Sequence, residues 1–475
     1  MRRILLIEPS YKNKYPPLGL MKISAYHKLL GDKVVFCKGT NFSLRQEKWD
    51  RIYITTLFTF FWNNTIKTIK YYLNSVERED NIYVGGPMAT VMEKEIHSQE
   101  GLKNICILKG ILDTPRTLDD NDYIVDDMLP DYSIIDPSKN DYLQYNYPVK
   151  EVFFVHTTRG CIRKCKFCAV PKIEPNFKCY IDIKPKINGI IEKYGMKSDL
   201  MILDNNILAS PNLGQIVEDI VDCGFGVNNN LFEYISNGKK VTKRRYVDFN
   251  QGLDARLLYK YPKKMELLSK IAIKPLRIAF DHANDKFVKK YTRCMLLTAK
   301  YQIKDVSNYI LFNYNDEPDD LYKRLEINVL LNQQFKEKGY RTRIWSFPMR
   351  FSPVFGQGAK DRMYLGKKWG RKQLRAIQCI LNVTHGMVGP KIDFFRRAFG
   401  NDLNEFNQLL WMPEKYIIYR NENIQNKNSG RWVDLYSQLD PQSRTQFHAL
   451  IGDNVFVNKE SDNSIIELLL MHYSK

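Results

Sequence analysis

The sequence predicts an α/β protein in which helices cover mainly parallel β-sheets. Short runs rich in Val, Ile, Leu and Phe alternate with segments that carry apolar residues at helical spacing. This alternation occurs twice, first over residues 1–110 and again over residues 151–355. Because apolar strands joined through helices form parallel sheets that are buried on both faces, each series is expected to build its own layered core.

The first series predicts a Rossmann-like domain made of repeated β–α units. Helices are expected at 20–30 and at 64–76, where Ile66, Ile69 and Tyr72 share one face. Turns rich in Pro and Gly separate the units. The expected strands are 3–8, 33–37, 51–56, 81–84 and 104–108.

The second series predicts a partial barrel of six β–α units. The units recur at about 34 residues, which suits a β–α unit of roughly 30 residues or more. A complete eight-stranded barrel needs more strands than the sequence offers here, so an open (β/α)6 barrel is expected. The candidate strands are 152–156, 200–203, 246–249, 276–280, 307–312 and 342–347.

Composition divides the chain into three expected domains. Residues 111–150 are rich in Asp, Pro, Asn and Tyr and show little periodicity, so a linker is expected there. The Rossmann-like domain, with part of this linker, is assigned to residues 1–135 and the partial barrel to residues 136–355. Residues 356–475 combine helical stretches with polar loops and are expected to form a mostly helical domain.

The overall composition excludes several classes of protein. The 475 residues are 44% hydrophobic, which argues against intrinsic disorder. The apolar run at 4–7 is shorter than the core of a signal peptide, and no stretch reaches the ~18 apolar residues of a membrane span. Nine cysteines, an odd number, do not indicate a disulfide framework. A cytoplasmic protein without a membrane span is therefore expected.

Three of the nine cysteines form a compact motif. Cys161, Cys165 and Cys168 follow the expected strand at 152–156 with the spacing Cys-x3-Cys-x2-Cys. Thiolates are soft ligands that suit iron–sulfur clusters and zinc. Structural zinc sites have four ligands and usually paired Cys-x2-Cys halves; no second pair occurs here, although Cys179 could close a shell. Three ligands on a four-iron cluster leave one iron open for a reaction.

The cysteine segment resembles the radical S-adenosylmethionine superfamily, whose motif is Cys-x3-Cys-x-aromatic-Cys. The resemblance implies that Cys161, Cys165 and Cys168 bind a 4Fe-4S cluster and that Phe167 shields it. In that family the open iron binds the amine and carboxylate of S-adenosylmethionine. One electron from the cluster then cleaves this cofactor to methionine and a 5′-deoxyadenosyl radical. An electron donor such as flavodoxin or ferredoxin is therefore an expected partner.

Polar residues after the other barrel strands are expected to complete the site, because the carboxyl ends of parallel strands meet at one edge. The resemblance assigns the methionyl amine to Asp204, Asn205 and Asn206. Contacts with the ribose or carboxylate are expected from Gln251, Asp254 and Arg256. The candidates for catalysis are Asp281, Asn313, Arg350 and, in the C-terminal region, His385. The alternative for each strand-end residue is a helix cap, and a lone His is more often structural.

The N-terminal domain resembles the cobalamin-binding domain that precedes the barrel in one branch of this superfamily. Thr55, in Thr55-Thr56-Leu57, matches a Ser/Thr-x-Leu element, and Gly85 and Gly86 follow the fourth strand. Small residues there would let a corrin approach the backbone. The sequence has no Asp-x-His-x-x-Gly motif to supply an imidazole ligand. The sequence leaves two alternatives: the domain binds cobalamin without a protein imidazole, or it is a relic that has lost cobalamin and serves as a scaffold.

A second comparison, with methylthiotransferases, agrees less well. These enzymes also place a Rossmann-like domain before a radical barrel, but they need three further cysteines in it for an auxiliary cluster. The first domain here has only Cys37 and Cys106.

The charge of the chain indicates a polyanionic partner. There are 72 Lys and Arg against 53 Asp and Glu, a formal net charge of +19. Lys and Arg are interleaved with aromatic residues at 239–246, 286–293 and 364–372, a pattern that can bind phosphates and stack bases. The alternative is an ordinary solvated surface.

The expected function is that of a radical S-adenosylmethionine enzyme and candidate methyltransferase. With cobalamin, it would methylate an unactivated carbon of RNA or of another anionic substrate. One alternative is a cobalamin-independent radical enzyme with a relic Rossmann domain. The other is a non-catalytic iron–sulfur scaffold that binds nucleic acid.

Overall fold

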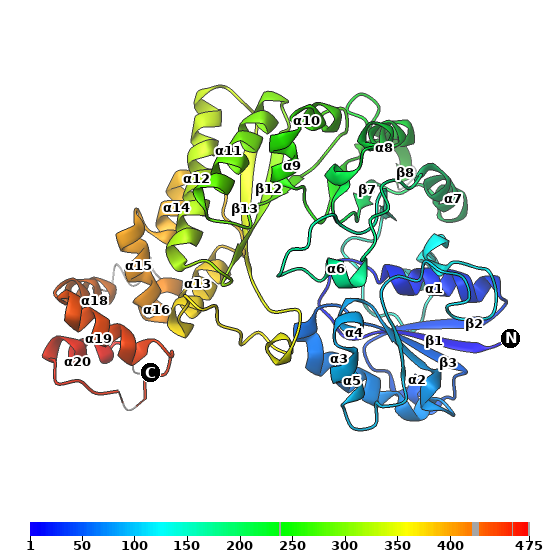
Figure 1. Ribbon diagram of the computed structural model, residues 1–475, viewed down its shortest axis with the longest axis horizontal. Coiled ribbons are helices and arrows are strands. Elements are labelled where there is room, and N and C mark those ends of the chain that lie inside the picture. Colours follow the sequence, from blue (N-terminus) through cyan, green and yellow to red (C-terminus); the bar gives the residue numbers. More distant parts are fainter. Residues whose placement is uncertain (237–238, 420–426, 458, 474–475) are drawn as a thin grey trace. The chain divides into compact units, whose positions relative to one another are not determined.

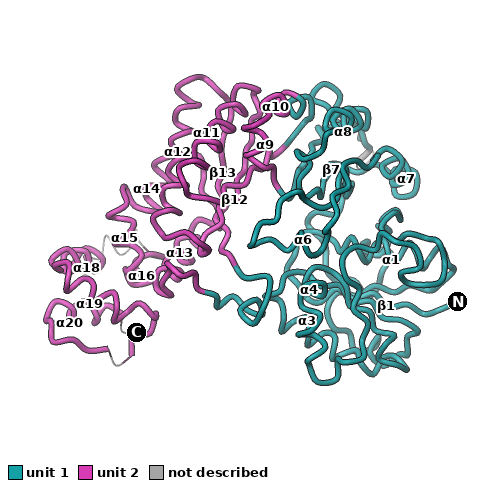
Figure 2. The backbone as a smooth tube through the Cα atoms, in the orientation of Figure 1, with its two compact units in different colours: residues 1–251, 267–273, 352–364 teal, residues 252–266, 274–351, 365–475 magenta. Residues whose placement is uncertain are grey.

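The computed structural model describes residues 1–236, 239–419, 427–457 and 459–473, which form two compact units (Figure 2). Unit 1 comprises residues 1–251, 267–273 and 352–364. Unit 2 comprises residues 252–266, 274–351 and 365–475. Both contain parallel sheet and helices, so the α/β class is confirmed. The domain boundaries near 135 and 355 stay predictions.

Unit 1 begins with a five-stranded parallel sheet of order β2-β1-β3-β4-β5, the blue part of Figure 1. The inner strand β1 is mostly apolar, and its residues Ile4, Leu5, Leu6 and Ile7 are fully buried. All five expected strands are present. They are β1 (Arg3–Glu8), β2 (Lys33–Lys38), β3 (Arg51–Thr55), β4 (Ile82–Gly85) and β5 (Cys106–Leu108).

Five helices accompany this sheet. The helix expected at 64–76 ends earlier, at Tyr71, and a 3₁₀ turn over Leu73–Ser75 follows it. Asn74 and Ser75 favour turns over helix interiors, which explains the early end. The helices are α1 (Leu18–Leu29), α2 (Phe42–Gln46), α3 (Trp62–Tyr71), α4 (Pro87–Val91) and α5 (Glu93–His97).

A second parallel sheet of unit 1 has the order β10-β7-β6. Its strands are β6 (Val152–Val155), β7 (Asp199–Ile202) and β10 (Val247–Phe249), and its helices are α6 (Val170–Ile173), α7 (Lys184–Tyr194) and α8 (Leu213–Ile220). Between β7 and β10 the chain forms an antiparallel hairpin, β8 (Leu231–Ser236) and β9 (Lys239–Arg244), which the sequence did not predict.

Unit 2 contains a third parallel sheet, of order β11-β12-β13. The six strands predicted for the barrel therefore all exist, as two three-stranded sheets, and their closure into a barrel stays a prediction. The strands are β11 (Leu276–Ala279), β12 (Asp305–Phe312) and β13 (Arg343–Arg350), and the helices beside them are α9 (Ala255–Lys260), α10 (Lys263–Leu268), α11 (Asp285–Lys300) and α12 (Pro318–Glu337).

After residue 370 the described chain is largely helical, as the sequence predicts. The helices are α13 (Arg371–Val383), α14 (Ile392–Phe399), α15 (Leu403–Trp411), α16 (Glu414–Ile418), α18 (Asn428–Ser437), α19 (Pro441–Ile451) and α20 (Ser464–Leu470). Within the described ranges, no helix has both the length and the apolar character needed to cross a bilayer.

One glycine of the first sheet has a clear packing role. Gly86 precedes α4 with φ +101°, and a Cβ there would lie 2.4 Å from the carbonyl oxygen of Thr56. The Thr56 hydroxyl donates to the Gly85 carbonyl at 2.9 Å and accepts from the Ala89 N–H at 3.0 Å. The connections after β3 and β4 are thus in direct backbone contact.

We predict that Gly86→Ala destabilises the protein by about 2 kcal/mol or more, because it adds both a clash and left-handed strain. Urea unfolding measures the change. The matched control is Gly19→Ala in α1, where an added Cβ meets nothing within 4 Å; this variant should be neutral or slightly stabilising. Equal unfolding midpoints for the two variants would contradict the packing role.

Candidate metal centre

Five residues separate the end of β6 from Cys161, the first residue of the cysteine loop. Cys161, Cys165 and Cys168 are all half-buried, and the Cys168 N–H donates to the Cys165 carbonyl at 3.1 Å, which closes a turn. The residues between them that point to solvent are Ile162, Lys164 and Lys166. The loop thus buries its three cysteines more deeply than these three residues.

A buried carboxylate, Glu174, fixes the start of this loop. One of its oxygens accepts from the Gly160 N–H at 2.6 Å and from Asn205 Nδ2 at 3.0 Å, and the other accepts from Arg159 at 3.0 Å. Gly160 has φ +70°, and a Cβ on it would lie 2.2 Å from the Asn176 carbonyl oxygen. Only glycine fits there. Sequence reasoning missed Glu174, because it belongs to no motif.

A second buried carboxylate, Asp204, connects the chain after β7 to the chain after β6. It accepts from the Thr157 N–H at 2.7 Å, from the Thr158 hydroxyl at 2.8 Å and from the Thr157 hydroxyl. Burial raises the pKa of Asp204 to about 6, although these hydrogen bonds oppose the shift. The predicted polar segment after β7 therefore does lie against the base of the cysteine loop.

Asn206, two residues further, reaches the cysteine loop itself. Its Nδ2 lies 3.5 Å from the Cys161 sulfur, and the residue is only 5% exposed. Its Oδ1 is buried and has no hydrogen-bond partner among the described residues. A buried amide oxygen without a donor is costly, so this atom is free to accept a hydrogen bond from a molecule bound beside the loop.

An ion-pair chain extends from the cysteine loop into the first sheet domain. Arg159 pairs with Asp126 at 3.0 Å, and Asp126 pairs with Lys22 of α1 at 2.7 Å. Burial raises the pKa of Asp126, but the charges of Lys22 and Arg159 outweigh it and hold the pKa below its usual value. Burial, and then the charge of Arg159, lower the pKa of His156, so a neutral imidazole faces Arg159 at 2.7 Å.

The residues predicted to contact the cofactor after β10 are divided between the two units. Gln251 is exposed at the end of a segment of unit 1. Within unit 2, Asp254 caps α9 and forms an ion pair with Arg256 at 2.7 Å. Asp281 is half-buried, and desolvation raises its pKa to about 6 against the lowering effect of Arg256. These three unit 2 residues form a small group of their own.

Two of the other predicted catalytic residues, Asn313 and Arg350, lie at the carboxyl ends of β12 and β13, the strands that follow β11 and Asp281 in the same sheet. Asn313 is fully buried with φ +67°; its oxygen accepts from the Gly366 N–H at 2.8 Å, and its nitrogen donates to the Phe351 carbonyl at 3.3 Å. The Asn313 side-chain amide therefore links the backbone at Phe351 to the backbone at Gly366. Arg350 is the last residue of β13, and His385 is exposed in the turn that ends α13.

The residues expected to contact cobalamin lie at the carboxyl edge of the first sheet. Thr55 and Gly85 are partners in the β3–β4 register. Gly86 is explained by its contact with Thr56, so the protein's own packing requires it. Its presence is therefore no independent indication of a corrin.

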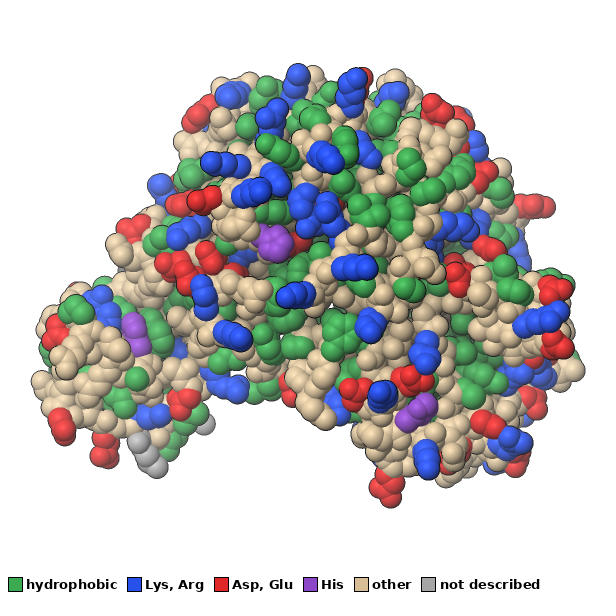
Figure 3. Space-filling model, in the orientation of Figure 1, with side chains coloured by type: hydrophobic (Ala, Val, Ile, Leu, Met, Phe, Trp, Pro, Cys, Tyr) green, Lys and Arg blue, Asp and Glu red, His purple; other side chains and the backbone are tan. Residues whose placement is uncertain are grey.

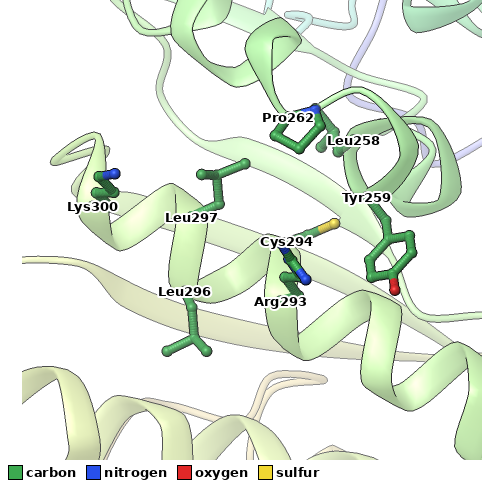
Figure 4. Close-up of a pocket in the computed structure, with 8 residues that line it drawn as sticks. All are labelled: Leu258, Tyr259, Pro262, Arg293, Cys294, Leu296, Leu297 and Lys300. Carbon is green, nitrogen blue, oxygen red and sulfur yellow. The ribbon is translucent and has the colours of Figure 1, made fainter.

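A cavity of about 240 Å³ lies in unit 2 (Figure 4). It is mostly apolar and contains none of the predicted site residues. Pro262, which follows α9, and residues of α9 and α11 line it. The lining residues are Leu258, Tyr259, Pro262, Arg293, Cys294, Leu296, Leu297 and Lys300. We assign it no part in the candidate centre.

The donor set of the loop fits a cluster better than a single ion. Within the described part of the chain, no three His, Cys, Asp or Glu side chains are arranged to hold a metal ion. A four-iron cluster binds each thiolate through a different iron and so accepts more widely spaced ligands than one ion does. The three half-buried thiols of the loop are the type of ligand that such a cluster takes.

Comparisons with known proteins do not identify the chain. No family model matches it, and no curated protein matches it significantly.

We predict that Asp204→Asn flattens the pH dependence of stability. The folded pKa, about 6, lies above the ordinary value of 3.8, so the folded state holds the proton more tightly and the wild type loses stability as the pH rises between these values. Asn keeps an acceptor for the Thr157 N–H and offers donors to the threonine hydroxyls. From pH 4 to pH 7 the variant should gain up to about 3 kcal/mol relative to wild type in urea unfolding. Parallel pH profiles would refute this role of Asp204.

Proposed function

We propose that the chain is a radical S-adenosylmethionine enzyme whose 4Fe-4S cluster is bound by Cys161, Cys165 and Cys168. The observation that carries the proposal is the position of the three half-buried thiols at the end of β6, with Asn206 from the end of β7 at 3.5 Å from one of them. Two neighbouring parallel strands thus supply both the sulfur ligands and the polar groups for a cofactor.

The cluster, when bound, supplies the electron that cleaves S-adenosylmethionine. The protein's part is to hold and orient the groups around it. Asn206 Oδ1 is available to accept from the ammonium group of the cofactor, and its Nδ2 is close enough to the Cys161 sulfur to influence the cluster's potential. Phe167 is half-buried and adjacent to Cys168 in sequence, and its proposed role is to shield the cluster. Glu174 and Arg159 keep the loop's entrance rigid.

The reaction beyond radical formation depends on the first sheet. With cobalamin at its carboxyl edge, near Thr55 and Gly85, the enzyme is a methyltransferase acting on an unactivated carbon. Without cobalamin, the S-adenosylmethionine cofactor would supply hydrogen-abstraction chemistry, and the reaction would be a rearrangement or direct modification of the substrate. Flavodoxin or ferredoxin would supply the electron. Because thiolate ligands and a reduced cluster need a reducing compartment, we place the protein in the cytoplasm.

Replacement of Cys161, Cys165 and Cys168 by Ala should abolish the cluster. Anaerobically purified, reconstituted wild type should be brown, contain about four iron and four sulfide per chain, and form 5′-deoxyadenosine after reduction. The triple variant should contain neither iron nor sulfide. Cys179→Ala, a half-buried cysteine near the loop in sequence, is the matched control and should keep both.

A wild type without iron and sulfide would end the proposal, and so would unchanged 5′-deoxyadenosine formation in the triple variant. A cluster that forms but never cleaves S-adenosylmethionine would instead support the non-catalytic scaffold.

Asn206→Leu tests the cofactor contact separately from the cluster. The variant should keep its iron and sulfide, whereas its affinity for S-adenosylmethionine, measured by equilibrium binding, should fall about tenfold or more because the amide acceptor is lost. Asn176→Ala, an exposed residue of the same region, should bind as wild type does. Unchanged affinity in Asn206→Leu would show that the buried oxygen serves another purpose.

A further inference from the structure

The β8–β9 hairpin of unit 1 is exposed on both faces. In the residues whose side chains are described, β8 has one half-buried position, Phe232, and β9 also has one, Val241. Leu231 is 56% exposed and Tyr234 41% exposed. An isolated two-stranded hairpin is marginally stable in water, because it buries little surface against the entropy it loses. The protein therefore maintains this ribbon with little help from a core.

The base of the hairpin is nevertheless firmly anchored. Arg245, directly after β9, is 5% exposed and lies 4.5 Å from the Phe225 ring centroid and 5.4 Å from that of Phe232. Its guanidinium donates to the Gly224 carbonyl at 2.9 Å. Asn230 and Arg245 exchange two hydrogen bonds across the base, at 2.7 and 2.8 Å. The ribbon thus projects in a defined direction.

One face of the ribbon combines aromatic rings with cations. Because side chains alternate along strands and register partners share a face, Phe232 lies opposite Lys243, and Tyr234 opposite Val241. Lys239, paired with Ser236, belongs to the same face. The Phe232 and Tyr234 rings are stacked at 5.5 Å with an interplanar angle of 22°. Two adjacent, nearly parallel rings are thus flanked by two lysines.

The charges of this face are largely uncompensated. The only acidic residue of β8 and β9, Glu233, lies on the opposite face and pairs with Lys240 at 2.5 Å. Among the described residues, Lys243 forms one ion pair, with Asp199 at 4.0 Å. Figure 3 shows Lys and Arg side chains scattered over the visible surface, so charge alone does not single out a site. The feature that singles out this face is the stacked pair of Phe232 and Tyr234 rings between the two lysines.

We propose that this face of the β8–β9 hairpin binds single-stranded nucleic acid. Exposed aromatic rings stack on bases of any sequence, and flanking lysines bind the phosphates. Lysines alone would suit an edge strand that must avoid aggregation, but that role does not require the exposed Tyr234 ring stacked on the half-buried Phe232 ring. An acidic peptide would use the charges and leave the rings unexplained. The inference needs no cluster; if the chain is the radical enzyme proposed above, it names a nucleic acid as the substrate class.

The experiment measures fluorescence anisotropy of labelled oligo-uridine RNA and oligo-thymidine DNA of about 12 nucleotides with the full-length protein. Wild type should bind with an affinity that falls as salt rises. Tyr234→Ala should weaken binding about tenfold through lost stacking. The double variant Lys239→Gln/Lys243→Gln should lower the slope of log affinity against log salt by about 1.4, since each single-strand phosphate contact contributes about 0.7.

Matched controls are Tyr142→Ala, 36% exposed, and Lys67→Gln/Lys70→Gln on the exposed face of α3, all within unit 1. Controls should bind as wild type, and circular dichroism should show that every variant is folded. Absence of binding, equal losses in hairpin and control variants, or a preference for duplex DNA, poly-glutamate or anionic vesicles would each overturn the proposal. The RNA and DNA arms decide which nucleic acid is preferred. Because the assay needs no iron, its failure leaves the radical proposal intact.

Discussion

Two buried carboxylates determine where the cysteine loop lies. Asp204 holds Thr157 and Thr158, and Glu174 holds the next two residues, Arg159 and Gly160, so four consecutive residues before Cys161 are fixed by side chains from elsewhere. A buried carboxylate is tolerated only when such bonds replace water. For Asp204, the three hydrogen bonds offset only part of the cost of desolvating the carboxylate, and its pKa is therefore raised.

The loop is also tied to the first sheet domain, through charge rather than apolar packing. Lys22 of α1 and Arg159 share Asp126, which lies in the 3₁₀ turn Val125–Asp127. Removing one member of a buried ion pair leaves an uncompensated charge, so such a chain holds its partners in one geometry more strictly than apolar contact does. The segment that looks like a plain linker in the sequence therefore supplies a central residue of the site's support.

The sequence predicts the strands that are marked by a run of apolar residues. It misses structure that depends on a partner distant in sequence, either a neighbouring strand or a hydrogen-bonding group. All eleven expected strands appear because each is a short apolar run. The β8–β9 hairpin was missed because β9 is mostly Lys, Arg and Thr, and its strand form depends on its partner. Asp204 and Asn206 could be foreseen from their position at a strand end. Glu174 could not, because only the folded loop brings it to Gly160.

The charge balance of the site bears on the meaning of the chain's +19. Around the cysteine loop, Lys22 and Arg159 are matched by Asp126 and Glu174, and Asp204 is satisfied by neutral donors. The buried support of the loop thus has no excess of cations and does not account for the surplus. Surface charge acts on encounters with partners and is screened by salt, whereas the buried pairs act on geometry and are screened much less. The net charge therefore bears on which partners the protein attracts. The geometry of the cysteine loop depends instead on the buried ion pairs of Lys22 and Arg159 with Asp126 and Glu174, which the net charge does not reveal.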